Sequence, residues 1–249
     1  MSVPPPVAAY CEAVEELLHG ILGDALVGLY LHGSGAMGGW HERLSDIDLL
    51  AVVDRTLTSE KKSAIAAVLA DLAAPGAGLE FSIVALSPFE PLLTAPKFEL
   101  HVTTGAEPKL VDGAGHPGDS DLVMHFAVCR ERGLAIFGPP PNELFPEVPR
   151  RMLLEAFHAE LAWGLANAPA RYGVLNACRA WAFAKEGRLL SKVEGGEWAI
   201  NRGFEPAAVG AALAAQRGDE VIISRGETER VVDRARSALR VAIDADGDA

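Results

Sequence analysis

One short segment, residues 31–50, constrains this chain more than any other. It reads Leu-His-Gly-Ser-Gly-Ala-Met-Gly-Gly-Trp-His-Glu-Arg-Leu-Ser-Asp-Ile-Asp-Leu-Leu. An apolar run over 25–32 predicts a buried strand that ends in a glycine-rich turn. At that turn, Gly33 lets the backbone approach a ligand closely, and Ser34 adds a hydroxyl to the backbone N–H groups. The segment therefore predicts a small anion-binding concavity that suits a phosphate.

Two aspartates close the same segment. Asp46 and Asp48 lie directly before, or at the start of, a second apolar run at 49–53. Alternate residues of a strand point to the same side, so both carboxylates should face one way while Ile47 enters the core. An isolated Asp-x-Asp is usually a solvated loop or a helix cap. Combined with the strand and the Gly-Ser turn, the pair predicts a Mg²⁺ site, because Mg²⁺ takes one or two carboxylates together with phosphate and water.

A third acidic residue stands inside another apolar run. Glu80 is the only charged residue in 79–86, which reads as a strand. A carboxylate in such a place costs free energy unless it is paired or lies near a metal ion. The alternative is a glutamate at a strand end that simply faces water. Both interpretations stay open from the pattern alone.

The chain divides into an α/β half and a helical half. The first half has helical periodicity at 8–22 and 58–72, with strands expected at 25–32, 49–53, 79–86, 98–103 and 109–111. The second half predicts helices at about 119–136, 149–166, 172–186, 205–216 and 226–244. We therefore expect two domains, residues 1–115 and 116–249.

Charge and cysteine content limit the functions to consider. With 22 basic and 34 acidic residues the formal net charge is −12, which disfavours nucleic acid as a partner. The three cysteines have no metal-type spacing and suit a reduced, cytoplasmic setting. The N-terminal residues have neither a basic nor an apolar signal region, and no apolar run is long enough to span a bilayer. We expect a cytoplasmic monomer with no membrane partner.

Gly-Ser followed by Asp-x-Asp resembles the motif of the nucleotidyltransferase superfamily. The resemblance implies a small, strongly twisted mixed sheet flanked by helices, with the metal carboxylates on adjacent strands and a third acid on a later strand. It assigns Asp46, Asp48 and Glu80 to Mg²⁺. The strand Leu79-Glu-Phe-Ser-Ile-Val resembles a Leu-Glu-x-x-x-Val strand of the aminoglycoside adenylyltransferases. That resemblance implies that Glu80 is the general base that deprotonates the acceptor hydroxyl, a task that suits a carboxylate beside a metal ion.

The helical half is similar to that of the aminoglycoside (3'')(9) adenylyltransferases. The similarity rests on Phe137-Gly-Pro, Glu143-Leu-Phe, Asn176-Ala-Cys-Arg-Ala-Trp and the stretch 187–199. It implies an all-α bundle that closes over ATP, the co-substrate. Arg179 and Lys192 stand where the family places basic contacts to the ATP phosphates, and the implied acceptor is a hydroxyl of an aminoglycoside-type antibiotic. Gly33 and Ser34 complete the implied nucleotide contacts.

Two positions depart from the members of that family that accept streptomycin. A tryptophan of those members falls near Gly105 here, and an aspartate falls near Pro169 or Ala170. The departures favour spectinomycin over streptomycin. The acidic and aromatic candidates for lining the substrate cleft are Glu99, Glu107, Asp119 and Tyr172.

Two other functions compete with antibiotic adenylylation. The chain could transfer a nucleotide to a protein or metabolite, although such transferases often lack a helical half of this size. It could instead be a nucleotide-binding regulatory module without catalysis. The intact carboxylates at positions 46, 48 and 80 argue against the second alternative.

Overall fold

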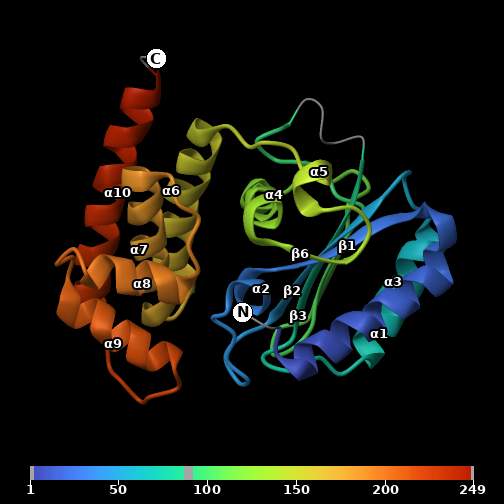
Figure 1. The fold of residues 1–249 in the computed structure, drawn as a ribbon, viewed down its shortest axis with the longest axis horizontal. Coiled ribbons are helices and arrows are strands. Elements are labelled where there is room, and N and C mark those ends of the chain that lie inside the picture. Colours follow the sequence, from blue (N-terminus) through green and yellow to red (C-terminus); the bar gives the residue numbers. More distant parts are fainter. Residues whose placement is uncertain (1–2, 87–91, 248–249) are drawn as a thin grey trace. The chain divides into compact units, whose positions relative to one another are not determined.

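The computed structural model describes residues 3–86 and 92–247 and divides into two compact units (Figure 1). The first is Met1–Val148 and the second is Pro149–Ala249. The expected boundary after residue 115 is therefore too early. The segment that follows residue 115 contributes a strand to the sheet of the first unit, so it cannot separate from that unit.

The first unit is built on a six-stranded mixed sheet. Its strands are β1 (Leu26–His32), β2 (Ile47–Val53), β3 (Leu79–Ala85), β4 (Leu100–Thr103), β5 (Lys109–Asp112) and β6 (Leu134–Phe137). They lie in the order β5-β4-β3-β2-β1-β6. Only β2 and β3 pair in parallel, and the other neighbours are antiparallel. The mixed sheet that the resemblance implied is confirmed.

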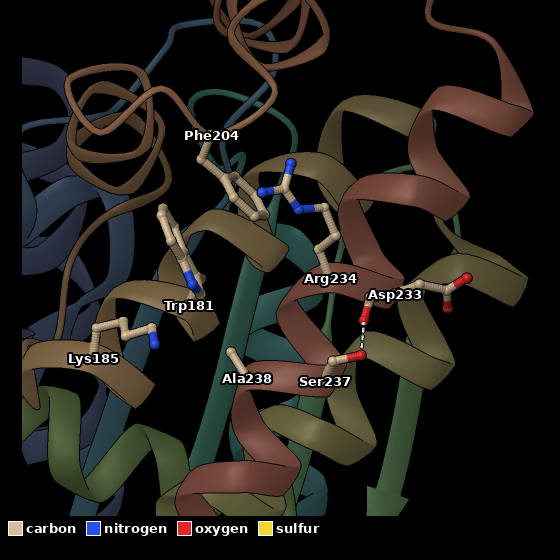
Figure 2. A pocket seen from close by; sticks show the side chains of 7 residues that line it. All are labelled: Trp181, Lys185, Phe204, Asp233, Arg234, Ser237 and Ala238. Atoms are coloured by element: carbon tan, nitrogen blue, oxygen red, sulfur yellow. Dashed lines mark hydrogen bonds between the residues drawn. The ribbon is translucent and has the colours of Figure 1, made fainter.

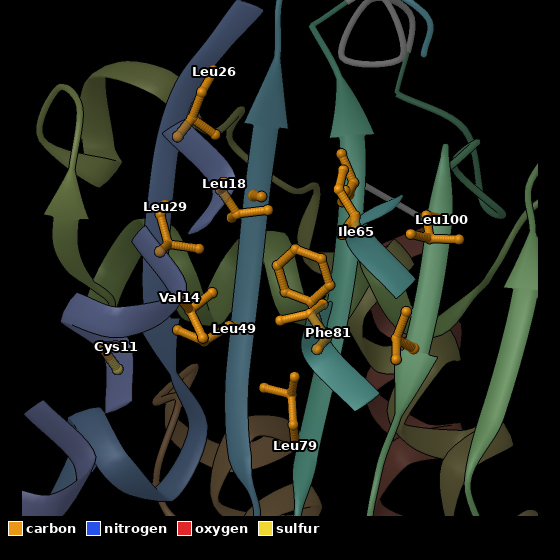
Figure 3. Packing of buried hydrophobic residues seen from close by; sticks show 14 of the residues in the cluster. Cys11, Val14, Leu18, Leu26, Leu29, Leu49, Ile65, Leu79, Phe81 and Leu100 are labelled. Atoms are coloured by element: carbon orange, nitrogen blue, oxygen red, sulfur yellow. The ribbon is translucent and has the colours of Figure 1, made fainter. Parts of the chain in front are cut away.

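Helices α1 (Pro5–Leu22) and α3 (Ser59–Asp71) cover one face of this sheet (Figures 1 and 3). Alternate strand residues such as Leu49 and Phe81 point into this layer and meet Val14, Leu18 and Ile65 from the helices. The start of α3 is fixed by Thr58, whose hydroxyl accepts from the backbone N–H of Lys61.

The opposite face is covered only in part, by α4 (Asp121–Arg132) and the short α5 (Pro141–Leu144). Leu122 and Phe126 of α4 pack with Leu50 and Val52 of β2 and with Phe145 in a second apolar cluster. The carboxyl end of β1 and the amino ends of β2 and β3 lie outside this cluster. His32, Asp48 and Glu80 lie at that end.

The helix expected over 119–136 is wrong in its last four residues, 133–136. Helix α4 ends at Arg132, and Leu134–Phe137 forms β6, which pairs with the edge of β1. A short apolar run suits a helix end or a strand equally well, so periodicity cannot choose between them. The open backbone edge of β1, which only the folded sheet supplies, decides for the strand.

The second unit is helical, as expected. It contains α6 (Arg150–Asn167), α7 (Ala170–Glu186), α8 (Lys192–Ile200), α9 (Pro206–Gln216) and α10 (Arg225–Gly247). Helix α7 is central and packs on the other four. The periodicity did not predict α8, whose start is nevertheless fixed by a capping box between Ser191 and Glu194. Within the described residues, no helix is both long and apolar enough to cross a membrane.

Candidate active site

Three carboxylates meet at the polar end of the sheet. In the β2–β3 ladder Asp48 lies opposite Glu80, so their side chains share one face. Asp46 directly precedes β2 and has the same parity as Asp48. Oxygen atoms of the three groups lie within 4.8 Å of one another, and all three residues are half-buried. The structure thus brings together the three acids that the sequence singled out.

This donor set fits a hard divalent cation. Like charges so close and partly removed from water repel one another, and a cation among them relieves that repulsion. Carboxylate oxygens without sulfur or imidazole are the donors that Mg²⁺ prefers. Within residues 3–86 and 92–247, no other group of three or more acidic, histidine or cysteine side chains has this arrangement.

The Gly-Ser turn lies against the same carboxylates. The short helix α2 (Gly33–Met37) starts here, and Gly33 has φ +57°. A Cβ atom at position 33 would lie 1.9 Å from Oδ2 of Asp48, so only glycine allows this approach. The Ser34 hydroxyl is buried and has no hydrogen-bond partner within the described part of the chain. A buried orphan hydroxyl beside three acids suits a ligand that supplies the missing partner.

Two histidines border the acids, and neither has a role that the sequence predicts. His125 of α4 places Nε2 3.7 Å from Oε1 of Glu80. The His32 ring at the end of β1 lies beside it, with ring centroids 4.8 Å apart. His32 is 4% exposed, and burial together with nearby His125 lowers its pKa well below the ordinary value, which keeps it neutral. Nothing in the local sequence links His125 to the motif, because only the packing of α4 on the sheet brings it there.

Further polar groups continue along the same face. Ser82 and His101 share a hydrogen bond of 2.9 Å between Oγ and Nδ1, on the neighbouring strands β3 and β4. Asp121, at the start of α4, has a raised pKa because local desolvation and the nearby charge of Asp119 disfavour its ionised form. Asp119, considered above for the substrate cleft, thus lies at this end of the first unit.

The two predicted cations belong to the second unit. The Arg179 guanidinium, on α7, donates from Nε to the Leu190 carbonyl (2.8 Å) and from Nη1 to Oδ1 of Asn176 (2.9 Å). Lys192, at the start of α8, holds its ammonium 4.3 Å from the centre of the Tyr172 ring. The predicted residues therefore form two sets: acids with the Gly-Ser turn in the first unit, and basic residues in the second.

One residue considered for the substrate cleft has a structural role instead. Glu99 accepts a hydrogen bond from the Leu57 backbone (3.0 Å) and pairs with Lys62 (3.4 Å), while Lys62 also binds Asp112 (2.8 Å). Lys62 is 7% exposed. This ion-pair group ties α3 to the β4–β5 side of the sheet.

The second unit also carries a hollow of about 450 Å³ (Figure 2). Figure 2 shows it bordered by the rings of Trp181 and Phe204 and by Lys185, Arg234 and Ser237. Trp181 stacks on Phe204 with ring centroids 4.1 Å apart. None of the residues predicted for the site lines this hollow, so it is separate from the two sets described above.

Comparison with known proteins identifies related transferases. A family model described as the C-terminal domain of aminoglycoside adenylyltransferase matches residues 143–240. An aminoglycoside (3'')(9) adenylyltransferase from Escherichia coli is 30% identical over 195 residues, which cover 73% of each chain. One from Klebsiella pneumoniae is 29% identical over 83% of this chain and 84% of its own length. A spectinomycin 9-adenylyltransferase from Staphylococcus aureus is 26% identical over 74% of this chain and 75% of its own length.

A solved structure shares the fold. The crystal structure of spectinomycin adenyltransferase AAD(9) from Enterococcus faecialis, with ATP and spectinomycin, superimposes with a TM-score of 0.76. The match covers 93% of this chain and 98% of the other, at 18% identity. A mixed sheet that presents a Gly-Ser turn and three acids is the arrangement expected of a nucleotidyltransferase domain. The chain belongs to the aminoglycoside (3'')(9) adenylyltransferase family of nucleotidyltransferases.

Proposed function

We propose that this protein transfers AMP from ATP to a hydroxyl of an aminoglycoside-type antibiotic, and so gives resistance to it. The observation that carries the proposal is the meeting of Asp46, Asp48 and Glu80 beside the orphan hydroxyl of Ser34. A site of this kind can hold a divalent cation and a phosphate side by side. Membership of the family supplies the reaction class.

Asp46, Asp48 and Glu80 would hold Mg²⁺. The ion supplies charge neutralisation for the triphosphate and for the pyrophosphate that leaves. The backbone at Gly33 and the hydroxyl of Ser34 bind phosphate oxygens in this proposal, since Gly33 lies against Asp48 in a turn that only glycine permits and the adjacent Ser34 hydroxyl has no partner among the described residues. Arg179 and Lys192 bind the ATP phosphates from the helical unit, Arg179 through its planar fork of donors and Lys192 as a point charge.

Glu80 acts as the general base in this proposal. Its carboxylate takes the proton of the antibiotic hydroxyl, and the hydroxyl oxygen forms a bond to the α-phosphorus of ATP. The bond between the α-phosphorus and the bridging oxygen breaks, and pyrophosphate leaves with that oxygen. Phosphoryl chemistry of this type needs mainly positioning and charge from the protein, which the two sets of residues supply.

The acceptor that we propose is spectinomycin rather than streptomycin. Gly105 has φ +100°, and a Cβ atom there would lie 2.1 Å from the Ala77 carbonyl oxygen. Position 105 therefore has no room for a side chain in this backbone conformation, and the loop after β4 contains no tryptophan like that of family members that accept streptomycin. Pro169 directly precedes α7 and offers no carboxylate for an antibiotic amine. A site that lacks these polar contacts should discriminate strongly between the two drugs.

The reaction is assigned to the cytoplasm, with the chain working as a monomer. It consumes ATP, and Cys11, Cys129 and Cys178 are all buried free thiols. Such thiols suit a reducing compartment.

A pyrophosphate-release assay tests the proposal. Purified protein is incubated with MgATP and spectinomycin, streptomycin, kanamycin, hygromycin or no drug, and each reaction is repeated with EDTA in place of Mg²⁺. We expect release with spectinomycin alone, lost in EDTA and reduced about 10²- to 10⁴-fold by Glu80→Gln, as for removal of a general base.

The other outcomes of the assay are equally informative. Release with both spectinomycin and streptomycin would keep the reaction but contradict the specificity drawn from Gly105 and Pro169. No release with any drug, from protein that binds MgATP, would overturn the antibiotic as acceptor. Protein and metabolite acceptors would then be tested with radiolabelled ATP.

A further inference from the structure

Four polar side chains in the second unit form a hydrogen-bonded network that includes Arg179, one of the two predicted cations. Tyr172 donates from its hydroxyl to Oε1 of Glu160 (2.5 Å), and Asn176 donates from Nδ2 to the same oxygen (3.1 Å). Asn176 accepts in turn from Nη1 of Arg179 (2.9 Å). Glu160 lies on α6, and the other three residues lie on α7.

The spacing of residues on α7 explains how the Glu160 carboxylate is connected to three side chains of that helix. Tyr172, Asn176 and Arg179 are at positions i, i+4 and i+7, so they share the face of α7 that meets Glu160. Asn176 is 3% exposed, and an amide buried to that degree is costly unless both of its ends are hydrogen-bonded. Here the donor end meets Glu160 and the acceptor end meets Arg179. The amide thus links a carboxylate to a guanidinium.

This network fixes the Arg179 guanidinium at two atoms. Nη1 is held by Asn176, and Nε is held by the Leu190 carbonyl on the chain that leads into α8. A free arginine side chain loses up to about 2 kcal/mol of rotamer entropy when it is ordered. A guanidinium already held by the fold has lost most of that freedom before a phosphate arrives, which favours binding.

The same carboxylate also anchors the second cation. Glu160 holds the Tyr172 hydroxyl, and the Tyr172 ring lies under the Lys192 ammonium at 4.3 Å. Close packing between α7 and α8 requires Gly195, because a Cβ atom there would lie 2.9 Å from Cγ of Arg179. Arg179 and Lys192 are therefore set by one group of contacts that begins at Glu160.

We propose that Glu160 and Asn176 are positioning residues that pre-orient Arg179, and through Tyr172 also Lys192, for the phosphates of the nucleotide. The inference rests on the proposed function, in which those two cations bind ATP. Glu160 and Asn176 act through Arg179 and do not touch the reacting atoms. Their loss should raise the Kd and KM for MgATP and leave kcat at saturating ATP nearly unchanged.

A double-mutant cycle on the whole chain tests this. The Kd for MgATP is measured by titration calorimetry in wild type, Asn176→Ala, Arg179→Ala and the double variant, and Tm is measured for each. We expect Arg179→Ala to weaken binding about 10- to 100-fold, as for loss of charged hydrogen bonds. Asn176→Ala should weaken it about 5- to 10-fold alone and by less than about twofold in the Arg179→Ala background, because it acts through Arg179.

Two further variants separate positioning from simple destabilisation. Glu160→Gln should weaken MgATP binding about 3- to 10-fold and show the same lack of additivity, and it completes the cycle if Asn176→Ala does not fold. Thr228→Val is the matched control, since it removes a buried hydrogen bond from Thr228 to the Ser224 carbonyl in the same unit. We expect it to lower Tm without changing the Kd for MgATP.

The results distinguish a failure of the positioning role from a failure of the proposed function. If Arg179→Ala weakens binding while Asn176→Ala and Glu160→Gln do not, the positioning role is wrong and the proposed function stands. If Asn176→Ala has an equal effect with and without Arg179, the residue does not act through Arg179 and the inference is overturned. If Arg179→Ala itself leaves MgATP binding unchanged, the proposed role of Arg179 and the inference fail together.

Discussion

The two units arrange their functional side chains by different means. In the first unit, the β2–β3 register and its continuation at Asp46 place the acids, so main-chain hydrogen bonds fix the positions of Asp48 and Glu80. In the second unit, Arg179 and Lys192 project from helices, and side-chain contacts with Asn176 and Tyr172 hold them. A β-ladder sets side-chain neighbours directly, whereas a long side chain on a helix needs other side chains to order it.

The difference predicts that the first unit contributes mainly to the chemical step and the second mainly to nucleotide binding. Rigidly placed carboxylates suit the step that breaks and forms bonds, because small displacements there are costly. Cations held by a side-chain network suit binding of the nucleotide, where affinity depends on how much order is present beforehand. Variants in the first unit should therefore act mainly on kcat, and variants of the basic set mainly on the Kd for ATP.

Among the substitutions that test this difference, Asp48→Asn should have the largest effect. Removing one carboxylate from the cation site should lower kcat on the order of 10³-fold, because the triphosphate charge is then poorly neutralised. The measurement is steady-state pyrophosphate release with spectinomycin at saturating MgATP. Asp54→Asn, an exposed aspartate just beyond the other end of β2, is the matched control and should retain wild-type kcat. Retention of more than a tenth of the activity in Asp48→Asn would contradict the assignment.

The second largest effect is expected from Gly33→Ala. The added Cβ would meet Oδ2 of Asp48 at 1.9 Å, and an alanine at φ +57° is strained. We expect roughly a 10²-fold loss of kcat/KM, since the turn and the carboxylate must move apart. Gly20→Ala, in α1 where an added Cβ meets nothing within 4 Å, should leave activity unchanged and slightly raise Tm. A fully active Gly33→Ala would show that the close approach is not needed.

Lys62→Met tests whether the buried ion-pair group of Lys62, Glu99 and Asp112 contributes to stability without contributing to catalysis. The ammonium is buried between Glu99 and Asp112, and its loss leaves Glu99, with a side chain 12% exposed, without its cation. We expect the free energy of unfolding to fall by about 2 kcal/mol, as for a lost charged hydrogen bond. Urea unfolding measures it, with Lys61→Met as control. A kcat unchanged within about twofold is expected, and a large fall in kcat would extend the functional region to this ion-pair group.

The smallest effect is expected at His125, which approaches the acids from a helix rather than from the sheet. His125→Leu removes the only imidazole that the described residues place within ion-pair distance of Glu80. We expect kcat to fall about 5- to 10-fold, with His125→Gln retaining more activity because its amide can still donate to the carboxylate. Equal kcat values for wild type and His125→Leu would restrict the functional set of the first unit to the strands and the Gly-Ser turn.

Much of the first unit could be predicted from sequence because its signals are local. The parity of Asp46 and Asp48 follows from strand geometry, and Glu80 was conspicuous as a lone charge in an apolar run. The boundary at residue 115 and the helix extended to 136 were wrong for a common reason. Whether Leu134–Phe137 forms a strand depends on the free edge of β1, which lies more than a hundred residues earlier in the chain.

The sequence by itself therefore determined the chemistry of the acidic set, which consists of the three carboxylates, the glycine and the serine. Their spacings in the sequence are enough to place them together once a strand and a turn form. Only the tertiary structure decided which side chains surround that set and the basic set. It brought His125 to Glu80 by packing α4 on the sheet, and it linked Glu160 to Arg179 through Asn176 by packing α6 on α7. The physical reason is that neighbours within a strand or a turn are fixed by backbone geometry, whereas neighbours across packed elements are fixed by the whole core.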